Sequence, residues 1–332
     1  MFLPNKQMVA SASASMLPNN LAVNLNAATG GADIVYIHKS AANLMLSEGS
    51  SGNGDGYLHR PVVCKIPTAN QQLAYILIMQ ADWVEVAGRK ILVLATQKGI
   101  KMYSGDGSAL LFWHGFGSGE KGDSILFTRG ITSIGSNTIC VGTSSGQLLS
   151  FTVPAKGDDI IFEEYIGGHE NSVTCVVARG DNLVSADESG VIIIRKHMDG
   201  TSFRVVKQLL GEGFPCNCLD IWQNIIVAGF GNGEIRIYHL SDGRLLGDIG
   251  AHARAINALH IAQGTGLCLS ASEDSYVRVW QMKAGESVEV SHVYSDKIND
   301  HQLTGAQFTD NDGKSFAVTA YDSTQIFTYH QS

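Results

Sequence analysis

The sequence predicts an all-β fold, a seven-bladed β-propeller, and three observations lead to it. A short apolar strand, a tight polar turn and a second apolar strand recur six times between residues 91 and 329. The steps between equivalent turn residues run from 42 to 49 residues, and a period of roughly 40–45 residues with strand–turn–strand content is typical of propeller blades. The turns are filled mostly by Gly, Asn, Asp and Ser, which tolerate the backbone that a tight hairpin needs.

The repeats are placed by their equivalent turn residues, which are Gly99, Gly146, Gly190, Gly233, Ser275 and Thr324. The repeat around Gly190 extends to four strands, which we expect at residues 172–178, 183–186, 191–196 and 203–210. Alternation of apolar and polar residues follows the turns of two other repeats. It predicts buried positions between neighbouring blades for Ile235, Ile237, Val277 and Val279.

A weaker unit precedes the six clear repeats and brings the number of blades to seven. NLAVNL (20–25) and DIVYIHK (33–39) predict a strand pair around the turn AATGGA. Six blades are the alternative. We expect residues 2–9 to supply the outer strand of the last blade and so to close the ring without an open sheet edge. Removal of the first ten residues should then destabilise the whole ring.

One long stretch interrupts the regular spacing. Residues 40–80 exceed what a connection between blades needs, and we interpret them as a loop insertion between the first and second blades. Their centre, about 47–57, is rich in Gly, Ser, Asn and Asp and should be mobile. A tolerated insertion and a functional loop both fit this composition. Because the blades of a repeat array share one core, we expect residues 1–332 to form a single domain.

The composition narrows the class of protein. Hydrophobic residues make up 44% and charged residues 16% of the chain, as in a globular β protein. The formal charge of −8 and the scattered Lys and Arg argue against a nucleic-acid partner. The longest strongly apolar run, residues 74–79, is far below the roughly 18 residues of a membrane span. We see no signal peptide, and the six cysteines lie mostly in predicted strands, so we expect a cytoplasmic, reduced protein.

The fifth clear repeat resembles a WD repeat. GAHARAINAL (250–259) leads into LSASEDSYVRVW (269–280), and the family pattern is matched by His252, Ser272, Asp274 and Trp280. The resemblance implies that these four residues form a buried hydrogen-bonded chain. Such a chain is chemically sound, because each member is polar and half buried and needs a partner. The resemblance also implies a non-enzymatic adaptor.

Other repeats depart from this pattern. One of them keeps Gly168 and His169, but Arg195 stands in place of the Trp and Ser189 in place of the Asp. Tyr or Phe replaces the Trp in most of the others. We therefore expect the divergent blades to be held more by packing than by a polar chain.

Three short motifs could carry chemistry, and each has a simpler structural interpretation. Residues 142–146 match G-x-S-x-G of serine hydrolases, but a strand follows instead of the helix that this motif needs. Residues 229–233 resemble a phosphate loop but lack its spacing and its helix. Cys216 and Cys218 have no second pair of metal ligands nearby, which favours packing over metal or redox use. We expect no catalytic residue, metal or cofactor.

The resemblance further implies where a partner binds. In WD propellers, whose blades have four strands a to d, the d–a connections and b–c turns gather on the narrower face around the central channel. Loops on a rigid scaffold are common recognition sites. Candidates on the d–a connections are Arg129, Glu170, Asn171, Phe214 and Arg254. Candidates on the b–c turns are Glu188, Phe230, Glu273, Tyr321 and Asp322.

Arg129 and Arg254 align between repeats, in TRGI and ARAI, so both should point near the channel mouth. Arginine and aromatic residues are typical interface anchors. The simpler alternative is an ordinary solvated loop position for each charged candidate. For Phe214 and Phe230 the simpler alternative is partial burial.

The function that we predict is a protein–protein interaction scaffold that binds a protein or peptide across the narrow face. One alternative is a structural subunit of a larger vesicle- or cilium-associated assembly, and another is self-association into homo-oligomers. Both would use the outer strands, where ALLFW (109–113) and FRVV (203–206) predict apolar patches. An enzyme is the third alternative, for which the chain offers no convergent acid, base, nucleophile or metal set.

Overall fold

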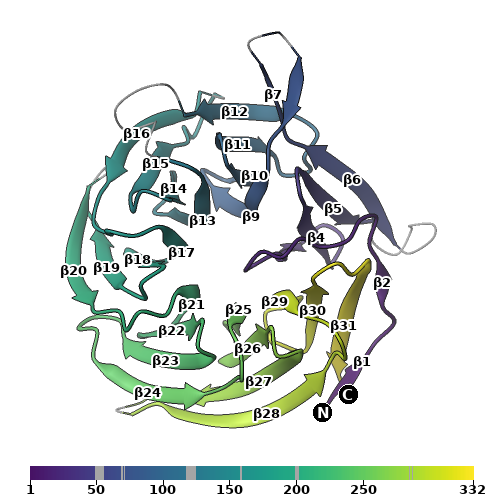
Figure 1. Cartoon of the computed structure of the whole chain (residues 1–332), viewed down its shortest axis with the longest axis vertical. Helices are drawn as coiled ribbons and strands as arrows, with labels where there is room; N and C mark the ends of the chain where they lie inside the picture. Colours follow the sequence, from purple (N-terminus) through teal and green to yellow (C-terminus); the bar gives the residue numbers. More distant parts are fainter. Residues whose placement is uncertain are drawn as a thin grey trace. The chain divides into compact units, whose positions relative to one another are not determined.

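The computed structural model describes residues 1–48, 56–68, 70, 72–116, 125–157, 159–198, 202–283, 285 and 287–332. Every regular element in these ranges is a β-strand, and the strands form seven sheets of four or more strands and one two-stranded sheet. The fold is a seven-bladed β-propeller, as the sequence predicts (Figure 1). The chain divides into two compact units, and the expected single domain over 1–332 stays a prediction.

The first unit comprises Met1–His38, Asn43–Arg60 and Asn217–Ser332 and holds most of four blades. One blade consists of β3 (Ala22–Asn26), β4 (Gly31–His38), β5 (Ala41–Ser47) and β6 (Tyr57–Val63). The next consists of β21 (Cys216–Trp222), β22 (Ile225–Phe230), β23 (Glu234–His239) and β24 (Leu245–Gly250). It is followed by β25 (Ile256–Ala262), β26 (Leu267–Ser272), β27 (Tyr276–Lys283) and β28 (Glu289–Lys297). The last blade contains β29 (Leu303–Phe308), β30 (Ser315–Ala320), β31 (Gln325–Gln331), β1 (Phe2–Pro4) and β2 (Met8–Val9).

The second unit comprises Lys39–Ala42 and Pro61–Cys216 and holds three blades. The first consists of β9 (Ile78–Val86), β10 (Arg89–Thr96), β11 (Gly99–Ser104) and β12 (Leu110–Gly115). The second consists of β13 (Thr128–Ile134), β14 (Thr138–Thr143), β15 (Leu148–Thr152) and β16 (Ile161–Ile166). The third consists of β17 (Val173–Arg179), β18 (Asn182–Asp187), β19 (Ile192–His197) and β20 (Phe203–Leu209). A hairpin of β7 (Lys65–Pro67) and β8 (Leu73–Tyr75) precedes them.

The strands of the best-defined repeat and its neighbours agree with the sequence. Strands β17 to β20 begin and end within one residue of the predicted strands. Four positions were predicted to lie between blades, and all are at most 2% exposed: Ile235, Ile237, Val277 and Val279. They belong to two apolar cores that combine residues from adjacent sheets of the first unit. Alternation along a strand therefore identified the buried face, because successive side chains point to opposite sides of a sheet.

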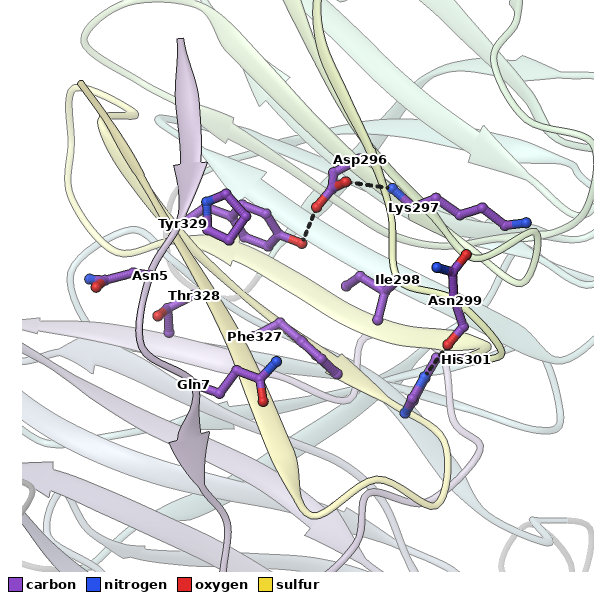
Figure 2. A pocket seen from close by; sticks show the side chains of 11 residues that line it. Asn5, Gln7, Asp296, Lys297, Ile298, Asn299, His301, Phe327, Thr328 and Tyr329 are labelled. Carbon is purple, nitrogen blue, oxygen red and sulfur yellow. Dashed lines mark hydrogen bonds between the residues drawn. The ribbon is translucent and has the colours of Figure 1, made fainter.

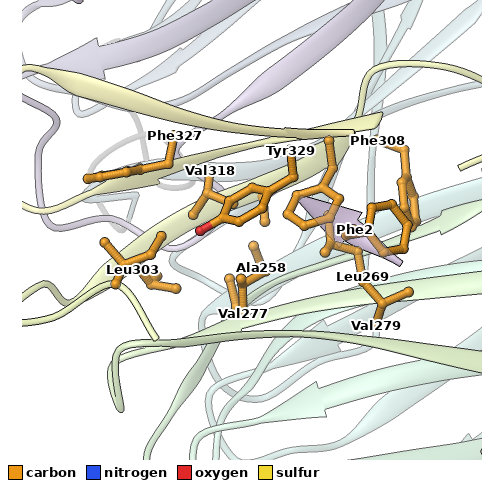
Figure 3. Packing of buried hydrophobic residues seen from close by; sticks show 14 of the residues in the cluster. Phe2, Ala258, Leu269, Val277, Val279, Leu303, Phe308, Val318, Phe327 and Tyr329 are labelled. Carbon is orange, nitrogen blue, oxygen red and sulfur yellow. The ribbon is translucent and has the colours of Figure 1, made fainter. Parts of the chain in front are cut away.

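The N-terminal segment closes the last blade, as predicted. Strand β1 pairs antiparallel with β31 from Phe2↔Gln331 to Pro4↔Tyr329, and β2 continues the pairing from Met8. The two termini lie side by side (Figure 1). Phe2 is 1% exposed, and its ring centre lies 5.2 Å from that of Phe316, inside the apolar layer shown in Figure 3. The N-terminal clasp, residues 2–9, therefore closes the last blade both by strand pairing and by burying the apolar side chain of Phe2.

The interpretation of residues 40–80 as a loop insertion is wrong for most of that stretch. Strands β5 and β6 are the third and fourth strands of the blade that β3 and β4 begin. Among the described residues of this stretch, only the β7–β8 hairpin is additional to the blade pattern. Sequence reasoning missed β5 because four consecutive residues, 42–45, are buried and hide the period of two, and it missed β6 because Pro61 argues against a strand. The mobile loop predicted at about 47–57 falls mainly on residues 49–55, which lie outside the described residues.

Candidate interaction surface

One backbone hydrogen bond recurs at five b–c turns and ties each of these turns to the start of strand a. The residue that follows strand b donates its N–H to the carbonyl of the residue that precedes strand a. Five sheets show it, at distances of 2.8–3.1 Å: Gln97→Leu77, Ser144→Phe127, Glu188→Ser172, Glu273→Ala255 and Tyr321→Gln302. The b–c turn and the approach to strand a are therefore held together as a preformed surface within each blade.

In the second unit this surface carries four exposed candidates and one that is largely buried. Glu170, Asn171 and Glu188 are exposed, and Phe214 is 47% exposed. Arg129 lies inside β13 instead of a connection, and its side chain is only 12% exposed. Its Nη2 lies 3.8 Å from Glu188 Oε1, so the structure brings these two candidates together. Burial lowers the pKa of the Arg129 guanidinium, and Glu188 opposes that shift.

In the first unit the corresponding loops carry four of the five candidates. Arg254, Tyr321 and Asp322 are exposed, and Glu273 is half buried. Asp322 has a φ of 54°, the left-handed region that Asp tolerates better than most residues. Phe230 was predicted here as an anchor, but it is 4% exposed and its ring packs 5.2 Å from the Arg236 guanidinium. It ends strand β22, where packing by the adjacent side chain covers it, so it is not part of the exposed surface.

The alignment of Arg129 with Arg254 gives two different environments. Arg129 belongs to the second unit and is mostly buried, whereas Arg254 belongs to the first unit and is exposed. That both point near one channel mouth stays a prediction.

The polar chain of the WD-like repeat is present in β25–β28, with one change of residue. His252 Nδ1 lies 3.1 Å from the Asp274 carboxylate, and its Nε2 lies 2.8 Å from Ser270 Oγ. Trp280 Nε1–H donates to the same Ser270 oxygen at 3.1 Å. Because a carboxylate only accepts, Nδ1 carries the proton and Nε2 accepts from the serine hydroxyl.

The hydroxyl in this chain was predicted to be that of Ser272, and that prediction is wrong. Ser272 and Ser270 point to the same face of β26, about 7 Å apart along the strand. Ser272 lies level with the turn, where it donates to the Arg254 carbonyl at 3.1 Å and accepts from Asp274 N–H. The His252 imidazole reaches from Asp274 in the turn toward the interior of the blade. Its Nε2 therefore contacts Ser270, two residues before Ser272 in the strand.

The negative charge of Asp274 is stabilised at the end of the hydrogen-bonded chain that lies in the turn. Burial works against the Asp274 carboxylate, but hydrogen bonds from His252 and from two backbone N–H groups outweigh it and lower its pKa to about 2. Burial lowers the pKa of His252, against the pull of Asp274. The imidazole is therefore neutral near pH 7 and acts as a hydrogen-bonding link.

An equivalent chain exists in β17–β20, where we expected packing to replace it. His169 Nδ1 lies 3.0 Å from Asp187, and its Nε2 lies 2.8 Å from Ser185 Oγ. Arg195 Nη1–H donates to Ser185 Oγ at 2.6 Å, in the position of the Trp280 indole. The acid is Asp187, two residues before the expected position at Ser189, and it accepts from the Ser189 hydroxyl at 2.7 Å. The sequence held a signal for this, because Ser185 and Ser270 both lie five residues before their turn residues.

The guanidinium in this chain is deeply buried. Arg195 is 1% exposed, and its Nη2–H donates to the Gly167 carbonyl at 3.0 Å. Burial lowers its pKa to about 10, so it stays charged at neutral pH. Gly168, with a φ of 147°, leaves the space that the guanidinium fills, since a Cβ there would collide with Nη2. The guanidinium of Arg195 can thus take the place of the Trp indole because Gly168 has no side chain.

The three motifs with a chemical alternative occupy structural positions. Residues 142–146 join β14 to β15, a strand–turn–strand context, and Ser144 Oγ accepts the backbone N–H of Leu126 at 2.7 Å. Residues 229–233 join β22 to β23 in the same way. Cys216 and Cys218 are buried and unbridged on β21. In the described part of the chain, no group of three or more His, Cys, Asp or Glu side chains is placed to hold a metal ion.

The described residues contain no helix that is long and apolar enough to span a bilayer.

Comparison with known proteins gives full-length matches. A family model described as WDR54 matches residues 1–331. The chain is 36% identical over 348 residues to WD repeat-containing protein 54 of Mus musculus, covering 99% of each protein. It is 39% identical over 261 residues to WD repeat-containing protein 54 of Homo sapiens, covering 75% of this chain and 77% of that protein.

Two solved structures resemble the fold. A chain of the mitotic checkpoint complex aligns with a TM-score of 0.74 at 12% identity, over 98% of this chain and 91% of that one. The WD40 β-propeller domain of Doa1 aligns with a TM-score of 0.68 at 12% identity, over 98% and 97%. At this identity the likeness concerns the fold alone.

Proposed function

This chain belongs to the WDR54 family of WD-repeat proteins, and on that premise we propose that it is a cytoplasmic, non-enzymatic adaptor. In this proposal it binds a segment of another protein across the face formed by the b–c turns and the approaches to strand a. WD-repeat propellers are generally interaction scaffolds, which supports the class of function.

The observation that carries the proposal is the hydrogen bond that ties five b–c turns to the approaches to strand a. Preordered loops lose little entropy on binding, so a few anchors can supply the affinity. The exposed residues on these loops have the mixed character of protein recognition sites. They include an arginine, aromatic rings and carboxylates, at Arg254, Tyr321, Phe214 and Glu188.

The test uses one double variant in each unit. Arg254→Glu with Tyr321→Ser alters the first unit, and Glu188→Lys with Phe214→Ser alters the second. Arg129 is left unchanged, because a glutamate at that buried position would face Glu188. We expect quantitative affinity capture from cells to recover a set of proteins with the wild type. At least one of the two double variants should no longer bind that set.

The matched control lies on an outer strand. Arg204→Glu with Val205→Ser makes the same kinds of change as the Arg254 and Tyr321 pair, on exposed residues of β20. The control should keep the bound proteins. Capture that is unchanged in both loop variants would contradict the proposal.

Outer-strand exposure favours a second candidate, a structural or self-associating subunit of a larger assembly. Val205 is 54% and Val206 is 38% exposed on β20, and Leu210 just after it is 86% exposed. On β12, Leu110 is 51% exposed. Loss of bound proteins in the β20 control alone, or a sedimentation coefficient that rises with concentration and falls with that variant, would support this candidate instead.

A further inference from the structure

A pocket of about 290 Å³ lies in the first unit, beside the N-terminal clasp (Figure 2). The end of β28 and the β28–β29 connection form one wall, and β31 forms another. The segment between β1 and β2 completes the rim with the side chains of Asn5 and Gln7. This volume is at the lower end of small-molecule sites, roughly 300–1,000 Å³, and suits one long side chain.

The pocket contains a carboxylate without a cationic partner. Asp296 Oδ2 accepts the Tyr329 O–H at 2.8 Å, and Oδ1 accepts the backbone N–H of Lys297 at 2.9 Å. Asp296 forms no ion pair with any residue that the structure describes. The side chain of Lys297 runs away from the carboxylate (Figure 2). The charge is therefore oriented by neutral donors, and its remaining lone pairs are available to a ligand.

The Asp296 carboxylate acts on two neighbouring tyrosines. Burial and the nearby Asp296 charge together raise the pKa of Tyr329 and of Tyr294. A carboxylate attracts a cation, and the net charge of the chain, −8, has the same sign. The Lys297 ammonium also lines the pocket, but its side chain extends away from the carboxylate.

The walls suit a long side chain with a cationic end. Ile298, Phe327 and Tyr329 line the pocket with the small apolar and aromatic areas that remain exposed, 4–9% of each residue. His301 packs edge-on against Phe327 with ring centres 5.4 Å apart, and its Nδ1 is engaged by the Asn299 carbonyl at 2.7 Å. Aromatic faces attract cations, and the exposed amide oxygens of the rim can accept hydrogen bonds from them.

We propose that this pocket binds the basic side chain, arginine or lysine, of a partner's peptide segment, with the Asp296 carboxylate facing its charge. The inference rests on the proposed adaptor function and names a chemical feature of the partner. The methylene stem would lie along Ile298 and Phe327, and the charged group would reach the carboxylate. An anionic ligand is disfavoured by Asp296. A neutral ligand would leave that carboxylate unpaired.

The probes are three blocked amino acids of similar length: Nα-acetyl-arginine methylamide, its lysine counterpart and its citrulline counterpart. Citrulline matches arginine in shape but carries no charge. We expect ligand-observed NMR titrations to give at least tenfold tighter binding of arginine or lysine than of citrulline. The tighter of the two identifies the preferred side chain.

Asp296→Asn keeps an oxygen that can accept the Tyr329 hydroxyl and removes the charge, so it should abolish the difference between arginine and citrulline. Glu289→Gln, on the exposed far end of β28, is the control for net charge and should keep the difference. If Asp296→Asn does not fold, Tyr329→Phe provides the second variant. It retains the ring stacked on Phe316 and should weaken arginine binding about threefold.

Equal binding of arginine and citrulline, or wild-type binding by Asp296→Asn, would overturn the inference. These titrations need no partner protein. Failure of the capture experiment with the loop variants would therefore leave a charge-selective pocket in place, and failure of the titrations would leave the loop surface in place.

Discussion

The blades β17–β20 and β25–β28 build the same hydrogen-bonded chain from different residues. In both, an imidazole links a carboxylate near the turn to a serine deeper in strand b. The donor below the serine is the indole N–H of Trp280 in one blade and the guanidinium of Arg195 in the other. The carboxylate comes from Asp274, one residue before the turn residue, or from Asp187, three residues before it.

The comparison teaches that geometry defines the motif. The serine and the histidine occupy equivalent positions in both blades, because the distance between the two nitrogens of an imidazole is fixed. The residues at the two ends vary: an indole or a guanidinium donates to the serine, and the carboxylate comes from the last residue of strand b or from the turn that follows it. A blade whose sequence departs from the family pattern can therefore still form the same hydrogen-bonded chain.

The largest effect should come from removing the donor at the lower end. We expect Trp280→Ala and Arg195→Ala each to lower the free energy of unfolding by about 3–5 kcal/mol. Trp280 leaves a cavity, and Arg195 leaves a cavity and unpairs the Gly167 carbonyl. Urea denaturation measures both, with Arg204→Ala on exposed β20 as a control within about 0.5 kcal/mol. A loss below about 1 kcal/mol for Arg195→Ala would show that its blade is held by packing alone.

A smaller effect should separate the two serines of β26. Ser270→Ala removes the hydroxyl shared by His252 and Trp280 and should cost about 1–3 kcal/mol. Ser272→Ala should cost less, about 0.5–1.5 kcal/mol, because its bonds lie at the turn, where the backbone has other partners. Denaturation of the two variants side by side decides between them, and the reverse order would restore Ser272 to the central position.

An effect of similar size should be a dependence of stability on pH that the two blades share. The folded pKa of Asp274 is about 2, below its ordinary value, and the pKa of Asp187 is also lowered. Each charge therefore stabilises the fold above about pH 4, and that contribution is lost as the pH falls through the folded pKa, which for Asp274 is about 2. Asp274→Asn should lose about 1–2 kcal/mol at pH 7 and show a flatter acid limb, and Asp187→Asn should change both in the same direction.

Chemical denaturation at several pH values checks this expectation. An acid limb as steep in Asp187→Asn as in the wild type would mean that Asp187 is not equivalent to Asp274. The histidine of the Trp-containing blade acts in the same direction, since the lowered pKa of His252 also removes stability as the pH falls.

Much of the fold followed from local rules. The turns and the alternation of apolar residues located β17 to β20 within one residue, and the apolar start of the chain indicated the closing strand. The candidate surface followed less well. Glu188, Phe214, Arg254 and Tyr321 are exposed and lie outside the interiors of the strands, but Phe230 is buried and Arg129 lies within a strand. Asp296 gave no signal at all, since a lone aspartate at the end of a strand is ordinary.

The sequence by itself determined the period of the repeats, the positions of their turns and the strand that closes the last blade. Those features depend on backbone preferences and on the alternation of side chains, which are properties of short segments. Only the tertiary structure decided that Ser270, and not Ser272, receives His252 and Trp280, and that Arg195 replaces an indole. Residues two apart share one face of a strand, so a side chain from another segment must select between them.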